Sequence, residues 1–155
     1  MPRILLLLSF LRRSPKCIEL ALKIAKDRKA ELIVLFVLDV EIPEAVARKL
    51  TEDGWIGGKP SEQFLEALRV EYQEQAETKI REVEEAAHLS GIRVRSYSRQ
   101  GTLTEEALSV LDDEKIDLII VTRRKRSRLS RFLHGSAVAD LMKRAPCRVK
   151  VIDEE

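Results

Sequence analysis

The chain has few aromatic residues and few cysteines. Aromatic residues make up 5% of its 155 residues, so any core must be built from aliphatic side chains. The two cysteines, Cys17 and Cys147, are far apart, and neither belongs to a C-x-x-C pair. This spacing argues against a disulfide framework and a zinc ribbon, and we expect both cysteines to be small buried hydrophobic residues.

Long apolar runs are also missing. The longest uninterrupted run is Leu32 to Leu38, which is far too short to span a bilayer. The run Ile4 to Leu8 follows Arg3 as a signal-peptide core would, but Arg12 and Arg13 stand where small residues and a cleavage site should be. We therefore interpret this run as a buried strand, and we expect a cytoplasmic protein with no membrane partner.

The usual signatures of catalysis and metal binding are absent from the sequence. Gly57-Gly58-Lys59-Pro60 fails as a phosphate-binding P-loop, because Pro60 occupies the position of the magnesium-binding hydroxyl and the leading glycine is misplaced. No G-x-G-x-x-G follows the first strand and no G-x-S-x-G occurs, and His88 and His134 lack metal-ligand spacing. We predict no catalytic residue, no metal ligand and no enzymatic activity.

Five segments have the pattern of strands. Ile4–Leu8, Leu32–Leu38 and Leu118–Val121 are continuously apolar, as in parallel strands that are covered on both faces. Gly91–Tyr97 alternates between apolar and polar residues, which is typical of a half-buried or an edge strand. Arg148–Ile152 begins in the same way, which suggests another edge strand. We predict strands near residues 3–8, 31–38, 92–98, 117–121 and 148–152.

Helical patterns separate these strands. Ser14 and Pro15 begin the first helix as cap and first residue, Ser61 to Leu89 has an amphipathic stripe, and Thr102 or Thr104 caps a third helix. Ser136 begins the last helix, with Val138, Leu141 and Met142 predicted to point inward. Regular alternation predicts an α/β fold with an open parallel sheet and helices on both faces, in a single domain over residues 1–155. The irregular stretch Asp39–Pro60, with Trp55, is either a flap near the carboxyl ends of the strands or a plain insertion.

The charge is concentrated in one segment. Residues 123–131 carry six positive charges, and because the whole chain carries +2, the remainder carries −4. This basic loop directly follows a predicted strand, at the end of the sheet where open α/β proteins bind ligands. Gly135 and Ser136 come next at a helix start, where backbone N–H groups favour an anion, although Ser136 can also act as a simple cap.

The C-terminal third resembles the signature of the universal stress protein family. The resemblance is carried by the Gly-Ser turn, helix, Ala-Pro-Cys corner and final Val-rich strand of residues 135–152, by residues 129–133 and 117–121, and by Gly101. It covers essentially the whole chain. It implies the adenine nucleotide alpha hydrolase-like fold, with five parallel strands in the order 3-2-1-4-5. It also implies a homodimer, which we expect to form through the last strand, over residues 146–154.

Many members of this family bind ATP through G-x-x-G, nine residues, then G-[ST]. Here Thr122 and Lys125 occupy the first two glycine positions, whereas Gly135 and Ser136 keep the last pair. Ser9 replaces the family's aspartate at the end of the first strand, and Val37 keeps the position that contacts adenine. The candidate binding site, including three cations of the basic loop, therefore comprises these residues: Ser9, Val37, Thr122, Arg123, Lys125, Arg131, Gly135 and Ser136.

Several functions are compatible with this pattern. The first is a non-catalytic, dimeric stress-response module with weak or lost ATP binding, for which ATP is the one candidate cofactor and none is firmly required. The second is a nucleotide-binding switch in which the basic loop replaces the glycine cradle. The third is a polyanion or nucleic-acid binder, which is disfavoured because no aromatic residues alternate with the arginines to stack on bases. Slow ATP hydrolysis lacks a nameable general base.

Overall fold

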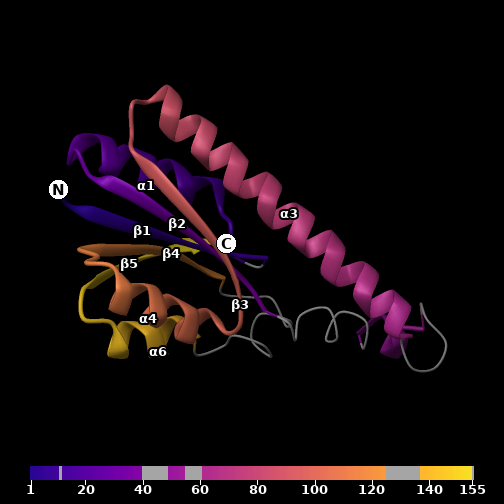
Figure 1. The fold of residues 1–155 in the computed structure, drawn as a ribbon. Coiled ribbons are helices and arrows are strands. Elements are labelled where there is room, and N and C mark those ends of the chain that lie inside the picture. Colours follow the sequence, from indigo (N-terminus) through magenta and orange to yellow (C-terminus); the bar gives the residue numbers. More distant parts are fainter. Residues whose placement is uncertain (11, 40–48, 55–60, 125–136, 155) are drawn as a thin grey trace.

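The computed structural model describes residues 1–10, 12–39, 49–54, 61–124 and 137–154. Strands and helices alternate along the chain (Figure 1). Their bounds are β1 Arg3–Ser9, α1 Pro15–Asp27, β2 Glu31–Leu38, α3 Glu62–Leu89, β3 Val94–Gln100, α4 Leu103–Asp113, β4 Leu118–Arg124, α6 Ala137–Arg144 and β5 Arg148–Glu154.

The five strands form one sheet in the order β3-β2-β1-β4-β5, and all four neighbouring pairs are parallel. The predicted architecture and strand order are therefore confirmed. Both alternating segments, β3 and β5, lie at the edges of the sheet, as their sequence pattern predicts. The structure differs at strand ends: β3 lies two residues further along the chain than predicted, and β4 continues beyond its apolar run to Arg124 because β5 pairs with it that far.

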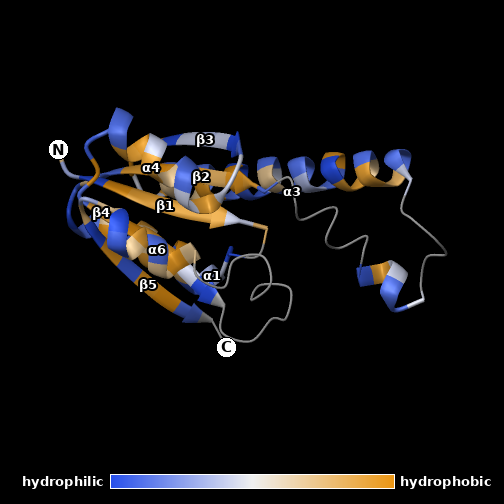
Figure 2. Cartoon of the chain, turned by 90° about the horizontal axis from the view of Figure 1, so that it is seen from below, coloured by the Kyte–Doolittle hydropathy of each residue, from blue (hydrophilic) through white to orange (hydrophobic). Residues whose placement is uncertain are grey.

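Helices α1 and α3 cover one face of the sheet, and α4 and α6 cover the other (Figure 1). Side chains of β1 alternate between the two faces: Ile4, Leu6 and Leu8 pack under α1 and α3, whereas Leu5 and Leu7 pack under α4 and α6. The central strands are thus apolar on both sides, and β3 is visibly more polar (Figure 2). This difference explains why only the central strands have uninterrupted apolar runs.

Helix boundaries follow the predicted caps in part. The Thr102 hydroxyl, one of the two predicted caps of α4, accepts a hydrogen bond from the N–H of Glu105 (3.4 Å). The Ser61 hydroxyl, which is not among the predicted caps, accepts one from the N–H of Phe64 (3.0 Å). Ser14 occupies the cap position of α1, but its side chain makes no capping hydrogen bond.

Two burial predictions are wrong. Met142 is 51% exposed, because the inner face of α6 is a narrow stripe along Val138, Leu141 and Ala145, and Met142 lies at its rim. Cys147 is only half-buried, since it precedes an edge strand, whereas Cys17 is fully buried on the inner face of α1.

Little of the irregular stretch 39–60 belongs to the described residues. Within it the structure describes Asp39 and residues 49–54, of which 49–52 are helical. The predicted flap and its Trp55 lie outside the described residues. Among the helices in the described ranges, none combines the length and the apolar character that crossing a bilayer requires.

Candidate functional site at the carboxyl ends of the strands

Three of the predicted site residues lie together at one end of the sheet. Ser9 ends β1 and is the direct register partner of Val37 on β2. On the other side of β1, Leu7 pairs with Val121, so Thr122 lies one residue further along β4. All three residues are buried. They mark the carboxyl edge of the sheet, where open α/β folds bind their ligands.

The three side chains do not share one face of the sheet. Val37 belongs to the core beneath α4 and α6. Thr122 instead lies beside the Cys17 thiol of α1. Burial raises the pKa of Cys17, and the neighbouring Thr122 hydroxyl offsets part of that shift. The Cys17 thiol is therefore protonated at neutral pH. Thr122 thus packs against a neutral side chain on the face of the sheet that α1 covers.

The backbone at Thr122 forms a strand, where the ATP-binding pattern of the family would begin a glycine turn. Residues 122 to 124 pair with residues 152 to 154 of β5. Among described residues other than glycine, only Lys29 has a positive φ, so Thr122 has an ordinary extended backbone. The glycine pattern is associated with positive φ and close approach of the backbone to phosphate, and Thr122 does not have a positive φ.

Arg123, the first cation of the basic loop, is bound within its own chain. Its Nε donates to Asp153 Oδ1 at 2.7 Å and its Nη2 donates to Asp153 Oδ2 at 3.2 Å. This two-pronged contact raises the pKa of the Arg123 guanidinium. The charge of Arg123 is therefore directed at β5.

The other predicted site residues, Lys125, Arg131, Gly135 and Ser136, lie outside the described residues. The described chain resumes at Ala137, the first residue of α6. Thr104, one of the two candidate caps of α4, donates its hydroxyl to the Ala137 carbonyl at 3.2 Å. This hydrogen bond joins the starts of α4 and α6 at the carboxyl edge of the sheet.

Sequence reasoning missed Arg12 as part of this site. Ser9 and Arg12 exchange two backbone hydrogen bonds of 3.0 Å, which turn the chain just after β1. The Arg12 side chain is only 2% exposed. A charged residue soon after a strand is usually solvent-exposed, so no local pattern predicts that a cation would be buried here.

Two buried hydroxyls at this edge have unmet hydrogen-bonding capacity. Ser9 Oγ and Thr122 Oγ1 have no hydrogen-bond partner within the described part of the chain. A buried hydroxyl without a partner costs about 1–3 kcal/mol. In the described ranges, no three His, Cys, Asp or Glu residues come together in a way that could hold a metal ion.

The arrangement of the sheet and helices agrees with comparisons to known proteins. The family model described as "Universal stress protein family" matches residues 1–153. The chain belongs to the universal stress protein family.

Individual relatives are distant. A curated universal stress protein of Methanocaldococcus jannaschii is 25% identical over 132 residues, which cover 85% of this chain and 70% of that protein. The solved structure of universal stress protein UspA from Lactobacillus plantarum has a TM-score of 0.69 at 18% identity, with 97% of each chain covered. An Arabidopsis thaliana member, solved with AMP bound, has a TM-score of 0.56 at 12% identity and covers 100% of this chain and 93% of its own. These structural likenesses establish the fold.

Proposed function

We propose that this chain is a non-catalytic regulatory module of the universal stress type, dimeric through β5, whose carboxyl-edge site binds ATP weakly or not at all. The observation that carries the proposal is that β4 continues as a paired strand through Thr122 to Arg124. A paired strand with a buried β-branched residue replaces the first part of the glycine cradle. Ser9 supplies a hydroxyl where the family has a carboxylate for the nucleotide.

Charge at the site supports only unselective binding. Arg123 is engaged by Asp153, so binding of phosphate to it competes with an existing ion pair. The remaining cations of the basic loop attract phosphate through space, and this attraction is screened by salt. Any nucleotide binding should therefore depend strongly on salt and should discriminate poorly among bases.

The second candidate is a nucleotide-dependent switch in which charge replaces the glycine cradle. The observation in its favour is the buried Arg12 beside Ser9, whose hydroxyl lacks a partner among the described residues. A buried guanidinium is a strong phosphate ligand. The AMP bound to the Arabidopsis thaliana relative shows that this fold can hold an adenine nucleotide. The corresponding site in this chain would be rebuilt around arginine. For the third candidate, nucleic-acid binding, most of the basic loop lies outside the described residues, and no observation in the described ranges favours it.

Calorimetry at about 0.15 M salt separates the first two candidates. The first predicts weak and similar heats for ATP, GTP and pyrophosphate, which decline as salt is raised. Tight, adenine-selective binding at that salt concentration would contradict it and support the switch. Mass spectrometry of the denatured protein gives an independent check, because a co-purified adenine nucleotide would also favour the switch.

A gain-of-function variant tests the stated cause. Ser9→Asp combined with Thr122→Gly and Lys125→Gly restores the family residues and should gain selectivity for ATP over GTP. The matched control is the Ser9→Asp variant alone, which restores the carboxylate without the glycines. Both variants need a cooperative thermal transition, because Ser9 and Thr122 are buried. An unchanged ATP:GTP ratio in a folded triple variant would show that the missing residues are not the reason.

The proposal includes a cytoplasmic location. Both cysteines, Cys17 and Cys147, are free thiols. Free thiols are usual in a reducing compartment, where disulfides are rare. This supports the location without identifying the stress signal or the protein partner.

A further inference from the structure

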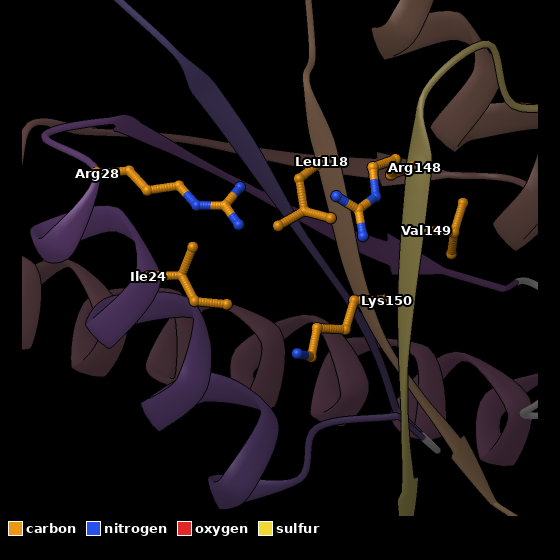
Figure 3. Close-up of a pocket in the computed structure, with 6 residues that line it drawn as sticks. All are labelled: Ile24, Arg28, Leu118, Arg148, Val149 and Lys150. Carbon is orange, nitrogen blue, oxygen red and sulfur yellow. The ribbon is translucent and has the colours of Figure 1, made fainter.

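A cavity lies at the opposite end of the sheet from the candidate nucleotide site. It has a volume of about 200 Å³ and opens between the end of α1 and the first residues of β4 and β5 (Figure 3). Its lining residues are Ile24, Arg28, Leu118, Arg148, Val149 and Lys150. Leu118 begins β4, a strand of seven residues. At about 3.3 Å per residue the cavity is roughly 20 Å from the carboxyl edge of that strand.

The cavity exists because of the alternation along the edge strand. Val149 and Val151 pack into the core beneath α4 and α6, so Arg148 and Lys150 extend to the other face of the sheet. On that face, Arg148 and Lys150 border the cavity together with Ile24 of α1 and Arg28, the residue that follows α1. A family-typical apolar strand would place aliphatic side chains here. This chain instead places two cations opposite a third, and all three are directed toward the same space (Figure 3).

The three cations are not neutralised by the surrounding chain. Within the described residues, no carboxylate lies within 4.0 Å of Arg28, Arg148 or Lys150, although most ion pairs elsewhere on the body use arginine. The neighbouring carboxylate, that of Asp117, accepts a hydrogen bond from the Arg3 backbone N–H at 2.8 Å. Among the described residues that line the cavity, none is acidic. Three like charges at one cavity favour binding of an anion that brings its own negative charge.

The C-terminus of α1 repels an anion in the cavity only weakly. Helix ends carry free carbonyls that repel anions. Here the Ala30 N–H donates to Ala25 O at 2.8 Å and the Lys29 N–H donates to Lys26 O at 3.2 Å. These two hydrogen bonds form a Schellman motif and occupy carbonyls of the last turn. The side-chain cations therefore dominate the charge of the cavity.

We propose that this cavity is a second ligand site, specific for a small organic phosphate. The cations Arg28, Arg148 and Lys150 would hold the phosphate, and the side chains of Ile24 and Leu118, on the same face of the sheet, would contact a short apolar group. The volume is below the 300–1,000 Å³ of sites for drug-sized ligands, which disfavours a whole nucleotide. The site is separate from the proposed nucleotide site at the carboxyl edge, and its failure would leave that proposal unaffected, although the cavity shares Arg148, Val149 and Lys150 of β5 with the proposed dimer contact.

Butyl phosphate and inorganic phosphate are the probes for a titration followed by amide and side-chain NMR in about 0.15 M salt. We expect butyl phosphate to shift the resonances of Arg28, Leu118 and Val149 at saturation, with a Kd of about 1 mM or below. Inorganic phosphate, which has no apolar group, should bind the same residues more weakly. Equal affinity for the two probes would overturn the assignment to an organic phosphate. Absence of shifts at these residues would overturn the site.

Variants then test the charge argument. Arg148→Gln with Lys150→Gln should weaken butyl phosphate binding at least about tenfold, because two of the three cations are lost. The matched control, Arg93→Gln with Lys143→Gln, removes the same charge at exposed positions on other elements. It should bind like the wild type. If both variants weaken binding equally, the effect is the general charge of the chain and the proposed site is wrong.

An acidic segment of a second copy is the competing occupant. The chain ends in Asp153, Glu154 and Glu155, and Asp153 is engaged by Arg123. Glu154→Gln with Glu155→Gln leaves the cavity residues intact. We expect this variant to bind butyl phosphate as the wild type does. A clear gain in affinity would show that the tail of a partner copy normally fills the cavity, and it would overturn the small-molecule assignment.

Discussion

At the scale of single residues, Lys29 has the one positive φ among described residues other than glycine, at 52°. It occupies the left-handed position that ends α1, where most proteins use glycine because a Cβ is strained there. The hydrogen bonds of the motif are backbone bonds and do not need the lysine side chain. The residue type at this position is therefore a stability defect that substitution can remove.

We expect Lys29→Gly to stabilise the protein by up to about 1 kcal/mol, since relief of the strained φ outweighs the added entropy of the unfolded chain. Denaturant unfolding at neutral pH measures the change. The control is Lys26→Gly in the last turn of the same helix, where glycine should destabilise by a similar amount. A Lys29→Gly protein less stable than wild type would contradict the strain argument.

At the scale of elements, ion pairs as well as backbone hydrogen bonds hold β3 against the sheet. The Arg95 Nη2 donates to Glu31 Oε1 at 2.8 Å on β2 and to Glu114 Oε2 at 2.7 Å after α4. Arg3 of β1 donates to Glu114 at 3.1 Å, so one network joins three strands and a helix end. Hydrogen bonds from Arg95 lower the pKa of Glu114, and the carboxylates raise the pKa of Arg95.

We expect Arg95→Met to destabilise the protein by about 1–2 kcal/mol at neutral pH, because Glu31 and Glu114 lose their closest cation and keep the longer contacts with Arg3, at 3.7 and 3.1 Å. Arg93→Met, an exposed change beside the same strand, is the control and should alter stability by about 0.5 kcal/mol or less. Denaturant midpoints of the two variants give the comparison. Equal midpoints would show that the network adds nothing to stability.

The lowered pKa of Glu114 also gives a dependence on pH. Its contribution is fully present above the pKa of an unfolded glutamate, about 4.3, and is lost as the pH falls through the lower folded value. Glu114→Gln should therefore flatten the acid side of the stability curve. Glu105→Gln, on an exposed pair with Arg144, serves as the comparison. Acid curves of identical steepness in Glu114→Gln and wild type would argue against this carboxylate.

The elements themselves were predictable, whereas their side-chain contacts were not. Uninterrupted apolar runs such as Leu32–Leu38 identify central strands, because only a residue covered on both sides must be apolar at every position. Arg95 and Arg123 gave no comparable signal, since their partners Glu31 and Asp153 are distant in sequence and become neighbours only through strand order. The burial of Arg12 could not be predicted for the same reason, because no local sequence pattern shows that other elements cover the end of β1.

At the scale of the whole molecule, the exposed edge of β5 is the basis of the proposed dimer. An unpaired edge strand offers free N–H and C=O groups to a second copy. A two-fold contact would place β5 antiparallel to its mate. Asp153 is already paired with Arg123 in its own chain, so the mate's Arg148 and Lys150 would meet less acidic charge than the sequence alone indicates.

We expect light scattering at micromolar concentration to give the mass of a dimer. Deleting residues 148–155 should give a monomer, because it removes the paired edge. Since β5 also covers β4, circular dichroism and a cooperative melt must show that the shortened chain folds. A monomeric wild-type chain would reject the dimer, and so would a folded truncated chain that remains dimeric.

Helix α3 extends far beyond the sheet that it packs on (Figure 1). Its fully buried residues, Ala76, Ile80, Val83 and Ala87, all lie in the second half. Near the middle of the helix, the ring of Tyr72 lies 4.2 Å from that of Phe10. We therefore expect the C-terminal half of α3 to unfold only together with the core, and the N-terminal half to unfold locally. Amide hydrogen exchange should record this as a gradient of protection along one continuous helix, slow near Val83 and orders of magnitude faster near Leu65.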